Sequence, residues 1–161
     1  MASVEESYNF RRIDDRLTTS GLVSAEQLAT LERDGYAAVI NLLPDNNERA
    51  VHDEAEIVVD QGLDYVSIPV DFAAPTHADL EQFFRAMDEL EGQKVHVHCA
   101  ANYRVSAFYS LYALRQGRCT VEQADALVRD VWDPAEHPAW AAFIADERAR
   151  LGARPTDDDP S

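Results

Sequence analysis

The strongest constraint on the fold is an apolar segment at residues 36–43. It reads Tyr-Ala-Ala-Val-Ile-Asn-Leu-Leu, is nearly continuous in apolar residues, and has the length of a strand. A half-buried strand alternates apolar and polar residues, so this segment is typical of a strand that is covered on both faces. Such a strand needs helices on each side of its sheet, and the rest of the chain must supply them.

Two further strands and several helices complete the pattern. Residues 65–70 and 94–98 have the length and composition of strands, and Pro69 marks the end or the edge of the first one. Helices are expected between and after the strands, at residues 24–33, 48–60, 76–91, 105–116, 120–131 and 138–151. Strands that alternate with helices predict a single α/β domain, in which a small, mostly parallel sheet is flanked by helices on both faces.

The domain is expected to span residues 1–153. Residues 1–23 show no clear period and are predicted to form an irregular N-terminal segment. Residues 154–161 are rich in proline and aspartate, so they are predicted to form a disordered acidic tail.

Residues 95–106 run from a strand through a tight loop into a helix. His98 and Cys99 end the strand, and Arg104 opens a helix that is apolar almost all round and should be the buried central one. The backbone N–H groups of the loop and of the helix N-terminus would converge on one point, which makes an anion site. The site would lie at the carboxyl end of a strand, where open α/β sheets bind ligands.

Cys99 is the candidate nucleophile at this site. A free cysteine is only a few per cent thiolate at neutral pH, but a helix N-terminus, loop amides and a guanidinium all favour the thiolate. Arg104 also offers a planar fork that fits two oxygens of a tetrahedral oxyanion. We therefore expect Cys99 to lie beneath an oxyanion, with phosphate favoured; the alternative is a buried, inert core thiol. Cys119 has no such cluster around it and is expected to be structural or incidental.

Asp71 is the candidate general acid. It follows the strand at residues 65–70 and could reach over the Cys99 loop. There it would protonate a leaving alkoxide and later activate water. The alternatives are a plain turn role for Asp71, or Asp79 or His77 as the acid.

A metal site is the other chemistry that these residues permit. His96, His98, Cys99 and Asp71 include ligand types suited to zinc. No second spaced cluster of such ligands appears along the chain, so no metal is expected.

Composition narrows the partners. Thirty acidic against fourteen basic residues give a formal charge of −16, which opposes binding to nucleic acid or to an anionic membrane. A phosphorylated substrate stays compatible, because salt screens surface charge beyond about 8 Å. No apolar run has the length of a membrane span, the start lacks a secretory pattern, and two cysteines form no disulfide framework. A cytoplasmic protein is therefore expected, with its oligomeric state open.

The central motif resembles the signature of the cysteine-dependent protein phosphatases. That signature has His98 and Cys99 after a short strand, a loop of small residues, and Arg104 entering a helix. The surrounding pattern agrees, with Val-Ile-Asn-Leu at residues 39–42 and Ile-Pro-Val-Asp at residues 68–71. The resemblance is to the compact dual-specificity-like branch, particularly the bacterial phosphatase-like domains related to the beta-lactamase hydrolase-like group.

The resemblance covers about residues 8–150 and implies a phosphatase-like fold and a phosphoric monoester hydrolase of the protein-tyrosine-phosphatase type. It implies that Cys99 attacks phosphorus and becomes phosphocysteine, that Arg104 and the loop amides hold the phosphoryl oxygens, and that Asp71 protonates the leaving group. No metal or organic cofactor is implied, and the substrate would be a phosphorylated protein or small molecule. The residues expected to bind it are His98, Ala100, Ala101, Asn102, Tyr103, Val105 and Ser106.

The loop departs from the family pattern at three points. Four residues separate Cys99 from Arg104 where the family has five. Asn102 stands where the family has glycine, and asparagine is the residue besides glycine that most readily takes a positive φ. Val105 replaces a serine or threonine, and Ser106 is the candidate to supply the hydroxyl that eases release of the thiolate.

These departures keep two alternatives open. A six-residue loop, counting both ends, also resembles that of the rhodanese sulfurtransferases, in which Cys99 would carry a persulfide. The loop could instead belong to a catalytically weak module that binds an oxyanion.

Overall fold

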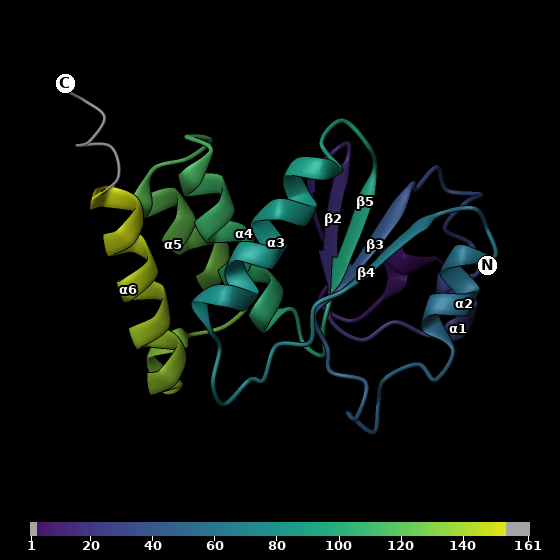
Figure 1. Cartoon of the computed structure of the whole chain (residues 1–161), viewed down its shortest axis with the longest axis horizontal. Helices are drawn as coiled ribbons and strands as arrows, with labels where there is room; N and C mark the ends of the chain where they lie inside the picture. Colours follow the sequence, from purple (N-terminus) through teal and green to yellow (C-terminus); the bar gives the residue numbers. More distant parts are fainter. Residues whose placement is uncertain (1–2, 154–161) are drawn as a thin grey trace.

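A five-stranded sheet lies between two layers of helices in the computed structural model, which describes residues 3–153 (Figure 1). In order across the sheet, the strands are β1 (Arg11–Asp14), β2 (Leu17–Ser20), β5 (Val95–His98), β3 (Ala38–Asn41) and β4 (Asp64–Ser67). β1 pairs antiparallel with β2, and every other pair is parallel. The mostly parallel sheet confirms the prediction.

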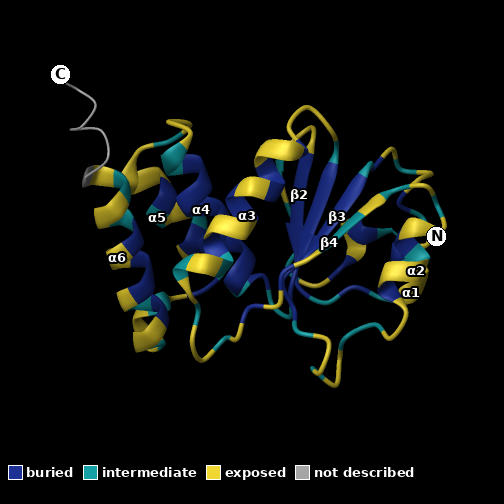
Figure 2. Ribbon diagram, in the orientation of Figure 1, coloured by how far each residue is buried: buried dark blue, intermediate teal, exposed yellow. Residues whose placement is uncertain are grey.

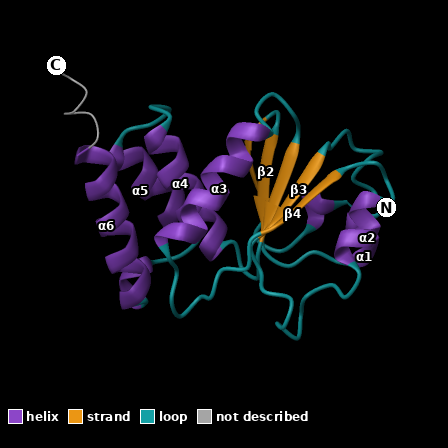
Figure 3. Cartoon of the chain, in the orientation of Figure 1, coloured by secondary structure: helices purple, strands orange, loops and turns teal. Residues whose placement is uncertain are grey.

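The helices cover both faces of the sheet, as predicted (Figure 3). One face carries α1 (Ala25–Leu28) and α2 (Glu54–Val59), and the other carries α3 (His77–Glu89) and α4 (Tyr103–Arg115). α5 (Val121–Arg129) and α6 (Pro138–Ala153) pack against α4, and two short 3₁₀ turns lie at Val4–Glu6 and Pro134–Glu136. No helix in the described part of the chain is long and apolar enough to cross a membrane.

The apolar segment at residues 36–43 forms the strand that both layers share. Ala38 and Ile40 face the larger hydrophobic cluster, which contains side chains of α3, α4 and α6. Val39 faces a smaller cluster on the α1 and α2 side, with Leu28, Leu31 and Val58. The prediction that this strand is covered on both faces is confirmed, because all four residues of β3 are buried.

α4 is the central helix that the sequence predicts. Ten consecutive residues, Arg104 to Ala113, are buried, and the helix is dark along most of its length in Figure 2. Predicted caps are also present: Thr120 and Gln123 form a capping box at α5, and the Thr76 hydroxyl accepts the N–H of Asp79 at α3. Such caps satisfy N–H groups that a helix start leaves without partners.

The irregular N-terminal segment and the lengths of two helices need correction. Residues 1–23 are not irregular, because they contain β1 and β2, and β2 pairs with the strand that leads to Cys99. These strands are four residues long and mostly polar, so the hydrogen bonds from β1 to β2 and from β2 to β5 define them rather than an apolar pattern. The helices expected at residues 24–33 and 48–60 shorten to α1 and α2, with turns in the remainder. The tail predicted at residues 154–161 lies outside the described residues.

Candidate active site

The loops that follow β5, β3 and β4 gather at one end of the sheet (Figure 3). Cys99 leaves β5, the strand that β2 and β3 flank. Its N–H donates to the carbonyl oxygen of Ser20 at 3.3 Å, and the carbonyl oxygen of His98 accepts from the N–H of Leu42 at 2.9 Å. Both neighbouring strands therefore hold the point at which the chain turns into the loop.

Asn102 closes the short loop. Its φ of 68° lies in the left-handed region, as its residue type predicts, and it is the N-cap of α4. The backbone therefore enters the helix directly behind Cys99, so the first N–H groups of α4 and its positive dipole end face the loop. A helix therefore begins directly after the Cys99 loop, as the sequence predicts.

The thiol itself is enclosed. Cys99 has 0% of its surface exposed and belongs to the larger hydrophobic cluster. In this conformation a phosphate cannot reach Sγ, so any reaction at this sulfur requires the loop to open. This burial fits the alternative of a core thiol, and the role of Cys99 as a nucleophile stays a prediction.

Arg104 reaches across from α4 to the segment after β4. Its Nε donates to the carbonyl oxygen of Val70 at 2.9 Å, and its guanidinium carbon lies 5.1 Å from the centre of the Phe72 ring. The residue is only 8% exposed, yet its two terminal Nη groups have no hydrogen-bond partner among the described residues. Neither Nη is sealed in the interior, so this fork meets solvent and is open to an oxyanion.

Asp71 lies beside this contact. It is exposed, and its Oδ1 accepts the N–H of Ala73 at 2.9 Å within a turn. Because Arg104 binds the preceding carbonyl of Val70, the two candidate catalytic segments are joined directly. Asp71 thus directly follows Val70, whose carbonyl oxygen binds Arg104. In this conformation the carboxylate of Asp71 faces solvent.

The competing acids occupy other positions. His77 Nδ1 lies 2.9 Å from the carboxylate of Glu147, and its Nε2 lies 3.1 Å from Glu81. Asp79 is the first-turn acid of α3, where its N–H meets the hydroxyl of Thr76. Both residues are explained by helix and surface contacts.

The remaining predicted binding residues divide into two groups. The first group packs into the fold: Val105 lies in the larger hydrophobic cluster and Ala100 packs against it, while Ala101 and Asn102 form hydrogen bonds with Asn9. Two others have side chains directed elsewhere: Tyr103 stacks on Trp132 with ring centres 4.5 Å apart, and the Ser106 hydroxyl accepts from the indole of Trp132 at 3.1 Å.

The role expected for Ser106 meets an obstacle in this geometry. Its hydroxyl also donates to the carbonyl oxygen of Tyr103 at 3.1 Å, so its one proton is already used. The hydroxyl expected to ease release of the Cys99 thiolate is therefore directed to the aromatic side. The reason is Trp132, whose position depends on the packing of α5 against α4.

Residues near the N-terminus support the loop, which the sequence did not indicate. Asn9 Nδ2 donates to the carbonyl oxygen of Ala101 at 3.0 Å, and Asn102 Nδ2 donates back to the carbonyl oxygen of Asn9 at 2.9 Å. Gly21 lies so close that a Cβ there would be 2.6 Å from the carbonyl oxygen of Ala100. The only signal in the sequence was a lone glycine in a segment without a clear pattern.

No metal site accompanies the loop within residues 3–153, where no group of three or more His, Cys, Asp or Glu side chains is arranged to hold an ion. His96 instead lies between two hydroxyls, with Nδ1 2.8 Å from Thr18 Oγ1 and Nε2 2.9 Å from Ser20 Oγ. His98 Nε2 lies 2.5 Å from a carboxylate oxygen of Glu54 on α2.

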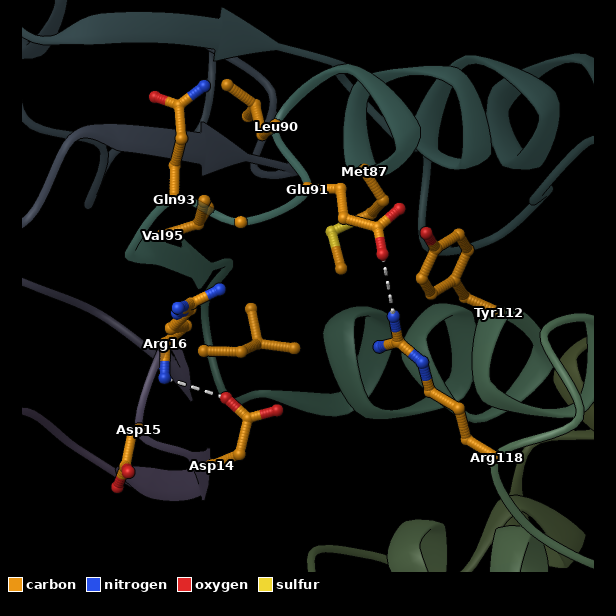
Figure 4. Close-up of a pocket in the computed structure, with 12 residues that line it drawn as sticks. Asp14, Asp15, Arg16, Met87, Leu90, Glu91, Gln93, Val95, Tyr112 and Arg118 are labelled. Carbon is orange, nitrogen blue, oxygen red and sulfur yellow. Dashed lines mark hydrogen bonds and ion pairs between the residues drawn. The ribbon is translucent and has the colours of Figure 1, made fainter.

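A cavity of about 520 Å³ opens at the other end of the sheet (Figure 4). It is lined by residues at the start of β2 and β5 and at the ends of α3 and α4. Charges of both signs surround it: Arg118 pairs with Glu91 at 3.9 Å, and the backbone N–H of Arg16 donates to Asp14 at 2.7 Å. This cavity is separate from the loop, which follows the opposite end of the same strands.

This chain matches a family model and curated relatives. The family model described as DSP-PTPase phosphatase fused to NAD+ kinase matches residues 2–138. A beta-lactamase hydrolase-like protein of Xylella fastidiosa (strain Temecula1) is 34% identical over 118 residues, which are 71% of this chain and 27% of that protein. The chain therefore spans about a quarter of the length of this curated relative.

Solved structures share the whole architecture. A DUF442 protein of Shewanella putrefaciens CN-32, described as a candidate phosphatase, has a TM-score of 0.84 and 38% sequence identity, and the match covers 92% of this chain and 96% of that one. TpbA of P. aeruginosa, in complex with pTyr, has a TM-score of 0.68 and 18% identity over 89% of this chain and 90% of that chain. The second likeness concerns the fold alone.

Proposed function

We propose a function on the premise that this chain belongs to the family described as DSP-PTPase phosphatase fused to NAD+ kinase. The family match confirms the resemblance that residues 98–104 suggested, and the similarity to a beta-lactamase hydrolase-like protein confirms the branch of the family. The proposed function is the hydrolysis of phosphate monoesters, with Cys99 as the nucleophile. Cysteine-based catalysis of this kind splits one difficult hydrolysis into two easier steps.

The observation that carries the proposal is the position of Arg104. A nearly buried guanidinium with two unpartnered Nη groups lies at the start of α4, five residues after a cysteine. The helix N-terminus adds N–H donors on the same side. A dianionic phosphoryl group would satisfy this set of donors, and Cys99 would lie beneath it.

In the first step, Sγ of Cys99 attacks phosphorus while the bond from phosphorus to the leaving oxygen breaks. Asp71 gives its proton to that oxygen, and the amides of residues 100–104 with Arg104 hold the three equatorial oxygens. In the second step, water attacks phosphorus, the sulfur–phosphorus bond breaks, and Cys99 leaves as thiolate. Asp71 takes the proton that the water loses.

Aromatic side chains beside the loop favour an aryl phosphate as substrate. Phe72 and Tyr103 are half-buried, their ring centres lie 6.2 Å apart, and the Phe72 ring lies 5.1 Å from the guanidinium carbon of Arg104. An aryl leaving group can pack on such rings. The pTyr bound to TpbA makes a phosphotyrosyl peptide a reasonable first substrate to test.

The decisive experiment measures turnover of p-nitrophenyl phosphate and of a phosphotyrosyl peptide. Cys99→Ser should abolish both activities, vanadate should inhibit them, and acid quenching should trap one phosphoryl group on the peptide that contains Cys99. Binding of phosphate without turnover would overturn the proposal in favour of an oxyanion-binding module. Sulfur transfer from thiosulfate to cyanide by the same chain would overturn it in favour of a persulfide carrier.

Because Sγ is enclosed, access is tested separately. In a Cys119→Ser background, iodoacetamide should modify Cys99 slowly, and saturating phosphate should protect it. A thiol that stays unmodified in the folded protein at every phosphate concentration would mean that the loop does not open, and the proposed chemistry would fail.

A further inference from the structure

A buried carboxylate lies behind the Cys99 loop, on the opposite face of the sheet from α4. Glu54, the first residue of α2, is 4% exposed, and its Oε2 lies 2.5 Å from Nε2 of His98. His98 is 2% exposed and immediately precedes Cys99. A carboxylate can only accept at this contact, so Nε2 of His98 carries the proton.

Glu54 is fixed by more than one strand. Its Oε1 accepts from Asn41 Nδ2 at 3.3 Å, and the same amide group lies 3.0 Å from the Tyr65 hydroxyl. Asn41 Oδ1 in turn accepts the N–H of Leu43 at 2.9 Å. The carboxylate therefore joins the carboxyl ends of β5 and β3 to the start of α2.

The contact with Glu54 is the main polar contact of the His98 side chain, because the other charged and titratable groups nearby do not hydrogen-bond to it. His96 stacks on His98 with ring centres 6.2 Å apart, and burial lowers its pKa well below the usual value, so it stays neutral. Burial and the charge of Glu54 raise the pKa of Tyr65 to about 12. Asp45, Glu48 and His52 line the cavity beside Glu54.

Stability alone is a poor reason for a buried acid at this place. Removing a carboxylate from water costs several kcal/mol, and apolar residues of similar volume often stabilise a fold equally well. His98 Nδ1 is also buried without a partner in the described part of the chain, so Glu54 supplies the one hydrogen bond that orients the imidazole. A ring fixed in this way fixes the backbone that delivers the next residue.

We propose that Glu54 is a positioning residue for the reaction at Cys99. By accepting the Nε2 proton of His98, it locks the imidazole and with it the end of β5, so that Sγ stays in line with a phosphoryl group in the loop. This inference rests on the proposed function of Cys99. It assigns to α2 a part in catalysis, although α2 contributes nothing to the anion site itself.

Two substitutions separate contact from charge. Glu54→Gln keeps an acceptor at the same reach and removes the charge, while Glu54→Asp keeps the charge and withdraws it from His98. We expect Glu54→Asp to lower kcat about tenfold, which corresponds to about 1.4 kcal/mol, and Glu54→Gln to lower it less than threefold. The inhibition constant of inorganic phosphate should change less than twofold in both, since Arg104 and the loop amides are untouched.

Glu147 offers a matched control. It is a buried glutamate that also binds a histidine, His77, but it lies on α6 on the other side of the sheet. Glu147→Asp should leave kcat within twofold of the unsubstituted chain. Imidazole nitrogen NMR adds a readout that folding alone does not move: His98 should show a single, protonated Nε2 in the unsubstituted chain and in Glu54→Gln, and tautomer exchange in Glu54→Asp.

Each remaining outcome contradicts the inference in a different way. If the unsubstituted chain turns over and Glu54→Asp matches it, Glu54 has no positioning role and the function of Cys99 stands. If Glu54→Gln loses as much as Glu54→Asp, an acceptor in contact with His98 is not enough, and the positioning role assigned to that contact is overturned. If the unsubstituted chain has no turnover, the proposed function falls and this inference falls with it.

Discussion

Asn102 carries the backbone conformation on which the short loop depends. A left-handed φ of 68° costs an ordinary L-residue about 1–2 kcal/mol, and asparagine and glycine tolerate it best. The side chain also donates to Asn9 and, at 3.0 Å, to the hydroxyl of Thr19. Asn102 therefore stabilises the loop both through its backbone conformation and through its side-chain hydrogen bonds, and substitutions can separate the two contributions.

We expect Asn102→Ala to destabilise the chain more than Asn102→Gly. Both variants lose the hydrogen bonds to Asn9 and Thr19, but only alanine adds the cost of the left-handed backbone, about 1 kcal/mol or more. Urea denaturation of the two variants measures the difference. Equal midpoints would mean that the loop has another low-energy backbone conformation.

Gly21 tests how tightly the N-terminal segment holds the loop. A Cβ at this position would lie 2.6 Å from the carbonyl oxygen of Ala100 and 2.8 Å from the Cα of Ala101, and both are backbone atoms. Gly21→Ala must therefore displace the loop, and we expect it to lower kcat/KM at least about tenfold. Gly152→Ala, where nothing lies within 4 Å of the new Cβ, is the control that should keep full activity.

Among the elements, the segment after β4 is held by the helices around it. The indole of Trp140 on α6 donates to the carbonyl oxygen of Phe72 at 2.7 Å, and the Phe72 ring packs 5.6 Å from that indole. Trp132 lies 5.9 Å from the same ring. Asp71 is adjacent to this anchored residue, so α6 fixes the position of the candidate acid.

Trp140→Phe should loosen the Asp71 segment while keeping an aromatic side chain in the core. Protonation of the leaving oxygen matters most for a poor leaving group. We therefore expect kcat to fall more with an alkyl phosphate than with p-nitrophenyl phosphate, and Phe143→Leu on the same helix to show no such difference. Equal losses of kcat on the two substrates would mean that α6 does not affect protonation of the leaving oxygen by Asp71.

Elements with strong local patterns were predictable, and elements defined by distant partners were not. The apolar run at residues 36–43 and the caps at Thr76 and Thr120 can be predicted from neighbouring residues alone. β2 does not, because its Leu-Thr-Thr-Ser sequence is polar, yet all four residues are buried. Hydroxyl partners on other segments make that burial possible, and no local period reveals them.

The candidate site divides in the same way. The spacing of Cys99 and Arg104 predicted a loop at a helix start, and the structure has it. The sequence did not predict three other features: the complete burial of Cys99, the hydrogen bond from Trp132 to the Ser106 hydroxyl, and the contact between Glu54 and His98. Each depends on side chains that only the folded sheet and helix layers bring together.

Across the whole molecule, a directed chain of hydrogen bonds runs through the α1 side of the sheet. Ser20 Oγ donates to the carbonyl oxygen of Gly21 at 2.9 Å, so it must accept from Nε2 of His96. Nδ1 of His96 then accepts from Thr18, whose oxygen accepts from the Tyr36 hydroxyl at 2.8 Å. Every proton is used once, and a second proton on His96 would displace the one that Thr18 donates.

This arrangement makes the stability of the fold depend on pH. Burial lowers the pKa of His96 well below its ordinary value, so the folded chain keeps this residue neutral while the unfolded chain binds a proton near pH 6.5. The unfolded state then holds more protons, and stability falls as pH falls. We expect this residue to remove about 1.4 kcal/mol of unfolding free energy between pH 7.5 and pH 5.5.

Urea denaturation at several pH values between 5.5 and 7.5 measures this loss, in a window above the usual range of carboxylates. His96→Asn should be less stable at pH 7.5, since it breaks the chain of hydrogen bonds, but its stability should change less with pH by about the amount assigned to His96. His52→Gln alters an exposed histidine and should keep the original slope. An unchanged slope in His96→Asn would place the pH sensitivity elsewhere and would mean that His96 accepts a second proton without unfolding the sheet.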